Sequence, residues 1–153
     1  MSIEVVKRDI SLKRLQAINE EIAREYVTYG VHRDKGTKRR GNTNEATIAS
    51  YLEFGTGTIA PRPAIRTFQI SPKAKQALMD KEAESMAKSL RKRTSKGFWD
   101  RVAGFVQEYV KERIINGLTP PNKPSTIARK GFDLPWVDTG RLVFEDMEAR
   151  VNK

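Results

Sequence analysis

The chain contains no cysteine and only one histidine, so several kinds of chemistry lack their usual residues. Without cysteine, disulfides and thiolate metal sites are excluded. A nucleophile activated by histidine would need His32, and no nucleophile motif accompanies it. A metal site built on nitrogen and sulfur ligands also lacks its ligands. We therefore expect no enzyme activity, no cofactor and no bound metal.

Long apolar runs are also missing. None of the 153 residues belongs to a stretch approaching the ~18–20 apolar residues that a membrane span needs. Residues 1–9 have no apolar centre of the kind found in a secretion signal. We expect one domain over residues 1–153, made in the cytoplasm and with no membrane partner.

Basic residues are abundant. Lysine and arginine number 29 against 19 acidic residues, which gives a net charge of +10. Such a field attracts polyanions, either nucleic acid or an acidic protein surface. Because charge carries no sequence information, any contact with DNA is expected to be non-specific.

The apolar pattern predicts an α+β fold in which helices pack on a small, mostly antiparallel sheet. Alternation predicts short strands at residues 3–7, 27–31 and 143–151. Capping residues predict helices after Ser11, Asn44 and Ser71. One long amphipathic helix, the strongest in the sequence, is expected over about 98–116, with this apolar face: Phe98, Val102, Phe105, Val106, Tyr109, Val110 and Ile114.

Two segments lack an apolar pattern. Residues 33–44 are basic and punctuated by glycine, which is typical of a mobile loop. Residues 118–141 are rich in proline, lysine and glycine and are expected to be irregular. A plain connector is shorter than this second segment, so we expect it to be functional or ordered by a partner.

The turn that begins at Glu53 and the proline loop that follows it have two interpretations. In the first, Phe54 is a core residue and Glu53 is a cap or an ion-pair partner. In the second, the segment is a rigid edge that contacts a neighbouring subunit, because a proline-fixed loop loses little entropy on binding. The expected subunit-interface residues are Glu53, Phe54, Gly55, Thr56, Pro61, Arg62, Pro63 and Arg66.

Two blocks of the chain resemble the tail-completion (neck, head–tail joining) proteins of tailed bacteriophages, a family of the lambda minor tail protein Z type. The first block is Glu53-Phe54-Gly55-Thr56 followed by Pro61-Arg62-Pro63. The second runs from Pro121 to Lys130 and continues into Asp138-Thr139-Gly140-Arg141-Leu142. The order of the blocks, with a long helix between them, carries the resemblance over residues 46–151.

The resemblance implies a structural virion protein, assembled in the host cytoplasm, that forms a ring of six or twelve copies at the neck. Its implied partners are the phage connector or adaptor and the tail terminator or tail tube proteins. Double-stranded DNA would pass through the ring, and the expected channel contacts are Arg33, Lys35, Lys38, Arg39 and Arg40. The alternatives are a tail-terminator ring that caps the tail tube and a free basic DNA-binding accessory protein.

Overall fold

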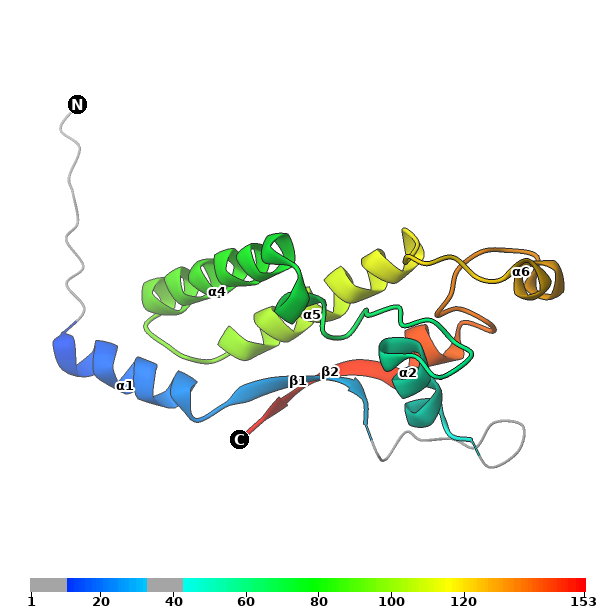
Figure 1. The fold of residues 1–153 in the computed structure, drawn as a ribbon. Helices are drawn as coiled ribbons and strands as arrows, with labels where there is room; N and C mark the ends of the chain where they lie inside the picture. The colour runs from blue at the N-terminus through cyan, green and yellow to red at the C-terminus, as the bar shows by residue number, and fades with distance from the viewer. Residues whose placement is uncertain (1–10, 33–42) are drawn as a thin grey trace.

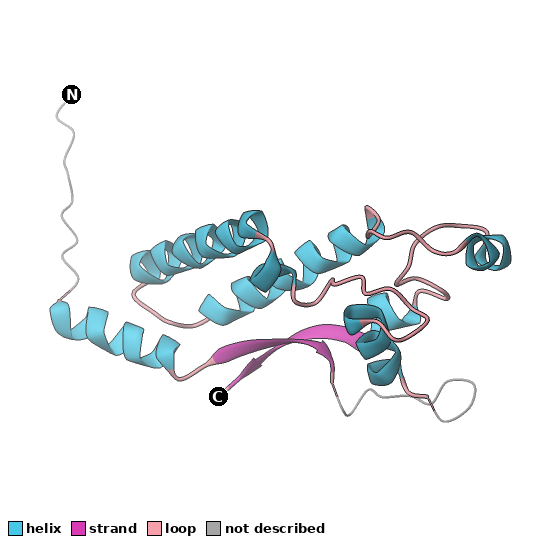
Figure 2. Ribbon diagram, in the orientation of Figure 1, coloured by secondary structure: helices cyan, strands magenta, loops and turns pink. Residues whose placement is uncertain are grey.

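The computed structural model describes residues 11–32 and 43–153 (Figure 1). Helices predominate in this part of the chain, and two strands form its sheet (Figure 2). In chain order the elements are α1 (Leu12–Ala23), β1 (Tyr26–Val31), α2 (Glu45–Phe54), α3 (Thr67–Ile70), α4 (Pro72–Lys92), α5 (Phe98–Ile115), α6 (Pro124–Lys130), the π-helical turn η2 (Leu142–Asp146) and β2 (Met147–Asn152). The predicted α+β class is confirmed.

The helices begin where the sequence predicts. The Ser11 side chain accepts a hydrogen bond from the Arg14 N–H at 3.3 Å, and Asn44 accepts one from Thr47 at 2.8 Å. Ser71 does the same for Ala74, with Pro72 in the first turn. Each side chain satisfies one of the N–H groups that the first turn of a helix leaves unpaired. The sequence did not predict the short helices α3 and α6 or the π-helical turn η2.

The two strands pair antiparallel, with Tyr26 opposite Asn152 and Val31 opposite Met147. Helix α5 packs on one face of this sheet, and α4 packs on the other side of α5 (Figure 1). α1 leads into β1 and extends away from the sheet. α6 lies at the opposite end of the molecule. The predicted strand at residues 3–7 and most of the predicted loop at 33–44 lie outside the described residues.

Two apolar clusters lie along α5. The first half of α5 packs against α1 through Phe98, Val102, Val106, Ile18 and Ile22. The second half forms the larger cluster with residues from α2, the loop after it, the 118–141 segment, η2 and β2: Ala49, Ala64, Val110, Ile114, Leu118, Trp136, Leu142, Val143 and Met147. The predicted apolar face of α5 is therefore confirmed, except that Phe105 and Tyr109 are only half-buried.

The last strand is shorter than predicted. Residues 142–146 form η2, and β2 begins at Met147 rather than at Val143. A strand would direct Leu142 and Val143 to opposite faces, whereas the wide turn buries both. The segment 118–141 is also less irregular than predicted, because it contains α6. This helix has only seven residues and none is buried, so no apolar stripe marks it in the sequence.

Candidate functional site

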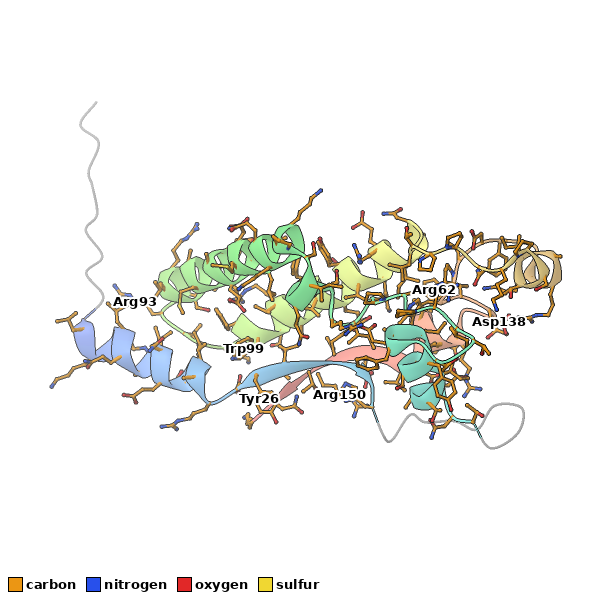
Figure 3. All side chains as sticks on the ribbon, in the orientation of Figure 1. Tyr26, Arg62, Arg93, Trp99, Asp138 and Arg150 are labelled. Atoms are coloured by element: carbon orange, nitrogen blue, oxygen red, sulfur yellow. The ribbon has the colours of Figure 1, made fainter. Side chains whose placement is uncertain are left out.

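The two blocks that carry the resemblance meet at one end of the molecule, although about 60 residues separate them in the sequence. They enclose a cleft of about 570 Å³. Helix α2 and the proline loop after it contribute Ile48, Leu52, Thr58, Ile59, Ala60 and Arg62 to its lining. Residues 120–142 contribute Pro120, Pro121, Asn122, Lys123, Thr126, Arg129, Lys130, Pro135, Trp136, Asp138, Thr139, Gly140 and Leu142. Figure 3 shows Arg62 and Asp138 at this end.

Glu53 fixes the backbone of the proline loop. Its side chain lies in the last turn of α2 and is 3% exposed. One carboxylate oxygen accepts hydrogen bonds from the N–H groups of Ala64 at 2.8 Å and Ile65 at 2.9 Å, and the other accepts from Arg66 at 3.1 Å. The Arg66 guanidinium is 3.3 Å from the same carboxylate. The buried negative charge is therefore compensated within the chain.

Arg62 joins the proline loop to the second block. Its guanidinium donates to the carbonyl oxygens of Pro120 at 2.6 Å, Pro121 at 2.8 Å and Ala60 at 3.1 Å. The Arg62 carbonyl in turn accepts a hydrogen bond from the indole N–H of Trp136 at 2.8 Å. Proline-rich backbone has few N–H donors of its own, so a side chain must satisfy its buried carbonyl groups.

The Gly55-Thr56 pair closes the turn between α2 and the loop. Gly55 has φ +79°, and a Cβ there would lie 2.8 Å from the Ile59 carbonyl oxygen. Thr56 donates its backbone N–H to that same oxygen, and its hydroxyl accepts from the Ile59 N–H at 3.1 Å. Only glycine fits this approach, which gives the Glu-Phe-Gly-Thr motif a structural explanation.

The predicted interface residues differ in exposure. Glu53 and Arg62 are 3% and 7% exposed, and their polar groups are bonded inside the chain. The interpretation of Glu53 as a cap is supported, but Phe54 is not a core residue because it is 63% exposed. The Arg66 guanidinium lies 4.9 Å from the centre of the Phe54 ring. Thr56 and Pro61 are exposed, and Gly55, Pro63 and Arg66 are half-buried.

The lining of the cleft combines basic and apolar side chains. Lys123, Arg129 and Lys130 line it together with one carboxylate, Asp138, which lies 3.5 Å from Arg129. Lys130 donates to the Leu134 carbonyl at 2.7 Å. Sequence reasoning missed Trp136, although an isolated tryptophan beside Pro135 in a polar stretch is a signal of a buried anchor. The arrangement suits binding rather than catalysis, because the Glu53 carboxylate and the Arg62 guanidinium are used to hold the backbone of the cleft walls.

The predicted DNA-channel residues Arg33, Lys35, Lys38, Arg39 and Arg40 all lie outside the described residues. A second basic group, Arg91 to Arg93, is exposed at the end of α4. Cations at a helix C-terminus interact favourably with the helix dipole, which gives this group a local explanation.

Residues suited to catalysis are not brought together in the described part of the chain. The His32 imidazole is 3.3 Å from the Glu148 carbonyl oxygen, a backbone contact at the edge of the sheet. Residues 11–32 and 43–153 contain no group of three histidine, cysteine or acidic side chains that could hold a metal ion. Nor does any helix in these two ranges combine the length and apolar character needed to cross a membrane.

Comparison with known proteins gives no match: no family model, no curated protein and no solved structure is significantly similar to this chain.

Proposed function

We propose that this protein is a structural subunit of a ring at the head–tail junction of a tailed bacteriophage. In this role it completes the neck and joins the connector to the tail around the DNA channel. The proposal rests on the resemblance of the two sequence blocks and on one structural observation. The blocks fold into a single unit, held by Glu53, Arg62 and Trp136, with a cleft between them.

This observation favours a docking role, because Glu53 and Arg62 hold the backbone of the motif rigid instead of facing a substrate. A loop held by three hydrogen bonds to one carboxylate loses little conformational freedom when another protein binds it. Phe54 and Tyr51 lie on the outside of the same unit and are 63% and 44% exposed. Exposed aromatic side chains on a rigid support are typical of protein–protein contacts.

The net charge of +10 supports a position around DNA. In the proposed ring, basic residues contact phosphates without reading sequence, and the contacts weaken as salt rises. The protein would be assembled in the host cytoplasm and remain in the virion. Its partners would be further copies of itself, the connector or adaptor, and the tail terminator or tail tube proteins.

The proposal is tested by electron microscopy of particles made without this protein. DNA-filled heads and separate free tails are expected, and complete virions would contradict a joining role. Complementation with Phe54→Ser should restore few joined particles. Complementation with Met79→Ser should restore them fully, because Met79 is 52% exposed on α4 and far from the motif in sequence.

A DNA-binding assay separates the neck proposal from the free accessory protein. Duplex binding by the purified protein should be weak at physiological salt if the ring only lines a channel. Sub-micromolar binding that falls steeply between about 50 and 200 mM salt would favour the accessory protein instead.

A further inference from the structure

The side chains that line the 570 Å³ cleft carry an imbalance of charge. Four of them are basic and one is acidic: Arg62, Lys123, Arg129 and Lys130 against Asp138. Four minus one leaves an excess of three positive charges in the lining. Asp138 lies 3.5 Å from Arg129, and this pairing does not change the excess. A ligand of this cleft is therefore favoured if it brings negative charge.

The charge of Arg62 is not balanced by a carboxylate. Its side chain is 7% exposed, and its guanidinium donates to the backbone carbonyl oxygens of residues 60, 120 and 121. Within the described part of the chain no acidic group pairs with it. A cation bonded to neutral partners keeps its field, and that field is stronger beside a wall of low dielectric constant than in water. An anionic group in the cleft would therefore be stabilised by Arg62.

The cation most available to a ligand is Lys123. Its side chain is exposed, and among the described residues it takes part in neither an ion pair nor a side-chain hydrogen bond. The Arg129 side chain is also exposed, at 66%. Lys130 is more engaged, because it donates to the Leu134 carbonyl and lies 4.8 Å from the centre of the Phe132 ring. Lys123 and Arg129 are thus the side chains that can meet a carboxylate from outside.

Apolar side chains give the cleft a second kind of contact. Ile48, Leu52 and Ile59 line it and are only half-buried, so they leave apolar surface exposed. The backbone at residues 120–121 is held by Arg62, so this wall needs little ordering when a ligand binds. The volume of about 570 Å³ accommodates a few side chains and is too small for a folded domain.

We propose that this cleft binds a short acidic segment of a partner protein, in which one large apolar side chain is flanked by carboxylates. The apolar side chain packs against Leu52 and Ile59, and the carboxylates meet Lys123 and Arg129. Duplex DNA fits less well, because its outer surface of phosphate and sugar has no apolar side group to place in the cleft. The inference rests on the proposed function for the partner being a neck protein, and it names the chemistry that recognises this partner.

Fluorescence anisotropy tests the site on the full natural chain. The probe is a dye-labelled peptide, Asp-Glu-Phe-Glu-Asp. One control, Lys-Lys-Phe-Lys-Lys, reverses the charge, and the other, Asp-Glu-Ser-Glu-Asp, removes the apolar side chain. The probe is expected to bind at least about tenfold more tightly than either control. No binding of the probe up to about 1 mM, or equal binding of either control, would overturn the proposal. So would a short DNA duplex that displaces the probe at a lower concentration than the unlabelled peptide does.

Substitutions locate the bound probe. Lys123→Glu should weaken binding about tenfold. Its matched control is Lys73→Glu, the same change of charge at an exposed position in the first turn of α4, which should change binding by about twofold at most. Asp138→Asn removes the one carboxylate of the lining and should tighten binding about threefold, an effect that partial unfolding cannot produce. Unchanged binding by Lys123→Glu, or weaker binding by Asp138→Asn, would overturn the proposal.

The same variants separate this inference from the neck function. Complete virions made without the protein, together with probe binding as predicted, would reject the neck function alone. If the protein is required for joining, complementation with Lys123→Glu should restore few joined particles, and complementation with Lys73→Glu should restore them fully. Full restoration by a Lys123→Glu protein that has lost probe binding would overturn the assignment of the cleft to a neck partner.

Discussion

The two ends of α5 are stabilised in different ways. At the helical end, formed by α1, α4 and the first half of α5, apolar side chains pack between helices that satisfy their own backbone. At the cleft end, formed by α2, the proline loop and residues 118–142, much of the backbone is neither helix nor strand. There a buried glutamate and a buried arginine satisfy the peptide groups.

The difference shows why the motif residues are charged. A buried peptide group without a partner costs about 1–3 kcal/mol, and a proline-rich segment leaves several such groups. One carboxylate can accept from several N–H groups and one guanidinium can donate to several carbonyl groups. Charged side chains are therefore an efficient way to order irregular backbone, whereas the helical end needs few of them.

The largest effect is expected from removing the glutamate at the cleft end. Glu53→Ala leaves the N–H groups of Ala64, Ile65 and Arg66 without their acceptor, and Ala64 is fully buried. We expect a loss of about 3–5 kcal/mol in the free energy of unfolding, measured by urea denaturation. Glu53→Gln keeps one acceptor oxygen and should lose about half as much. A loss below about 1 kcal/mol for Glu53→Ala would contradict the network.

The two tryptophans report the two ends separately. Trp136 is buried at the cleft end. Trp99 lies at the helical end (Figure 3), where its indole N–H donates to the Ile22 carbonyl at 2.8 Å. In Trp99→Phe protein only the cleft end contributes tryptophan fluorescence. In Trp136→Phe protein only the helical end contributes. If the two ends fold as one unit, the two proteins have the same unfolding midpoint by fluorescence, after correction for the change in stability that each substitution causes.

The next prediction concerns the contact between the ends. Phe68 of α3 packs against both apolar clusters and lies 5.1 Å from the Tyr109 ring centre. Because it is half-buried, Phe68→Ala should cost about 2–3 kcal/mol, below the ~3–5 typical of a fully buried phenylalanine. It should also separate the midpoints reported by Trp99 and Trp136. Ile70→Ala, exposed on the same helix, is the control and should do neither.

Sequence reasoning located the helical end better than the cleft end. Capping by Ser11, Asn44 and Ser71 and the apolar stripe of α5 are local signals, so they could be found without the fold. The burial of Glu53 and the exposure of Phe54 depend on where the proline loop turns. That turn is fixed by contacts with residues 118–142, about 60 positions away, which no local pattern reveals.

A smaller effect is expected from removing the charge at the helical end. Arg101 donates to the hydroxyls of Ser85 and Ser89, each at 2.9 Å, and to the Ser85 carbonyl at 3.1 Å. Arg101→Met keeps the apolar stem, and Ser85 retains its bond to the Phe98 carbonyl at 3.0 Å. We expect a loss of about 1–2 kcal/mol by urea denaturation, because the Ser85 hydroxyl keeps a partner and the Ser89 hydroxyl loses one. A loss as large as that of Glu53→Ala would remove the contrast between the ends.

The smallest effect, with the opposite sign, is expected at Tyr29, which packs against both clusters from β1. Its hydroxyl is buried without a hydrogen-bond partner among the described residues, and burial raises the pKa of Tyr29 above its ordinary value. Tyr29→Phe removes this unpaired group and should leave stability unchanged or raise it by up to about 1 kcal/mol at pH 7.

The pH dependence of stability provides a second test of the Tyr29→Phe prediction. A group whose pKa is higher in the folded protein than in the unfolded chain stabilises the fold below the unfolded pKa, which is about 10 for tyrosine. That contribution is lost as the pH rises further, because the unfolded chain then releases its proton more readily. The natural protein should therefore lose stability relative to Tyr29→Phe above about pH 10. Lysines titrate equally in both proteins, so the difference between their urea midpoints isolates the phenol. A difference that stays constant across this range would show that the Tyr29 hydroxyl reaches solvent.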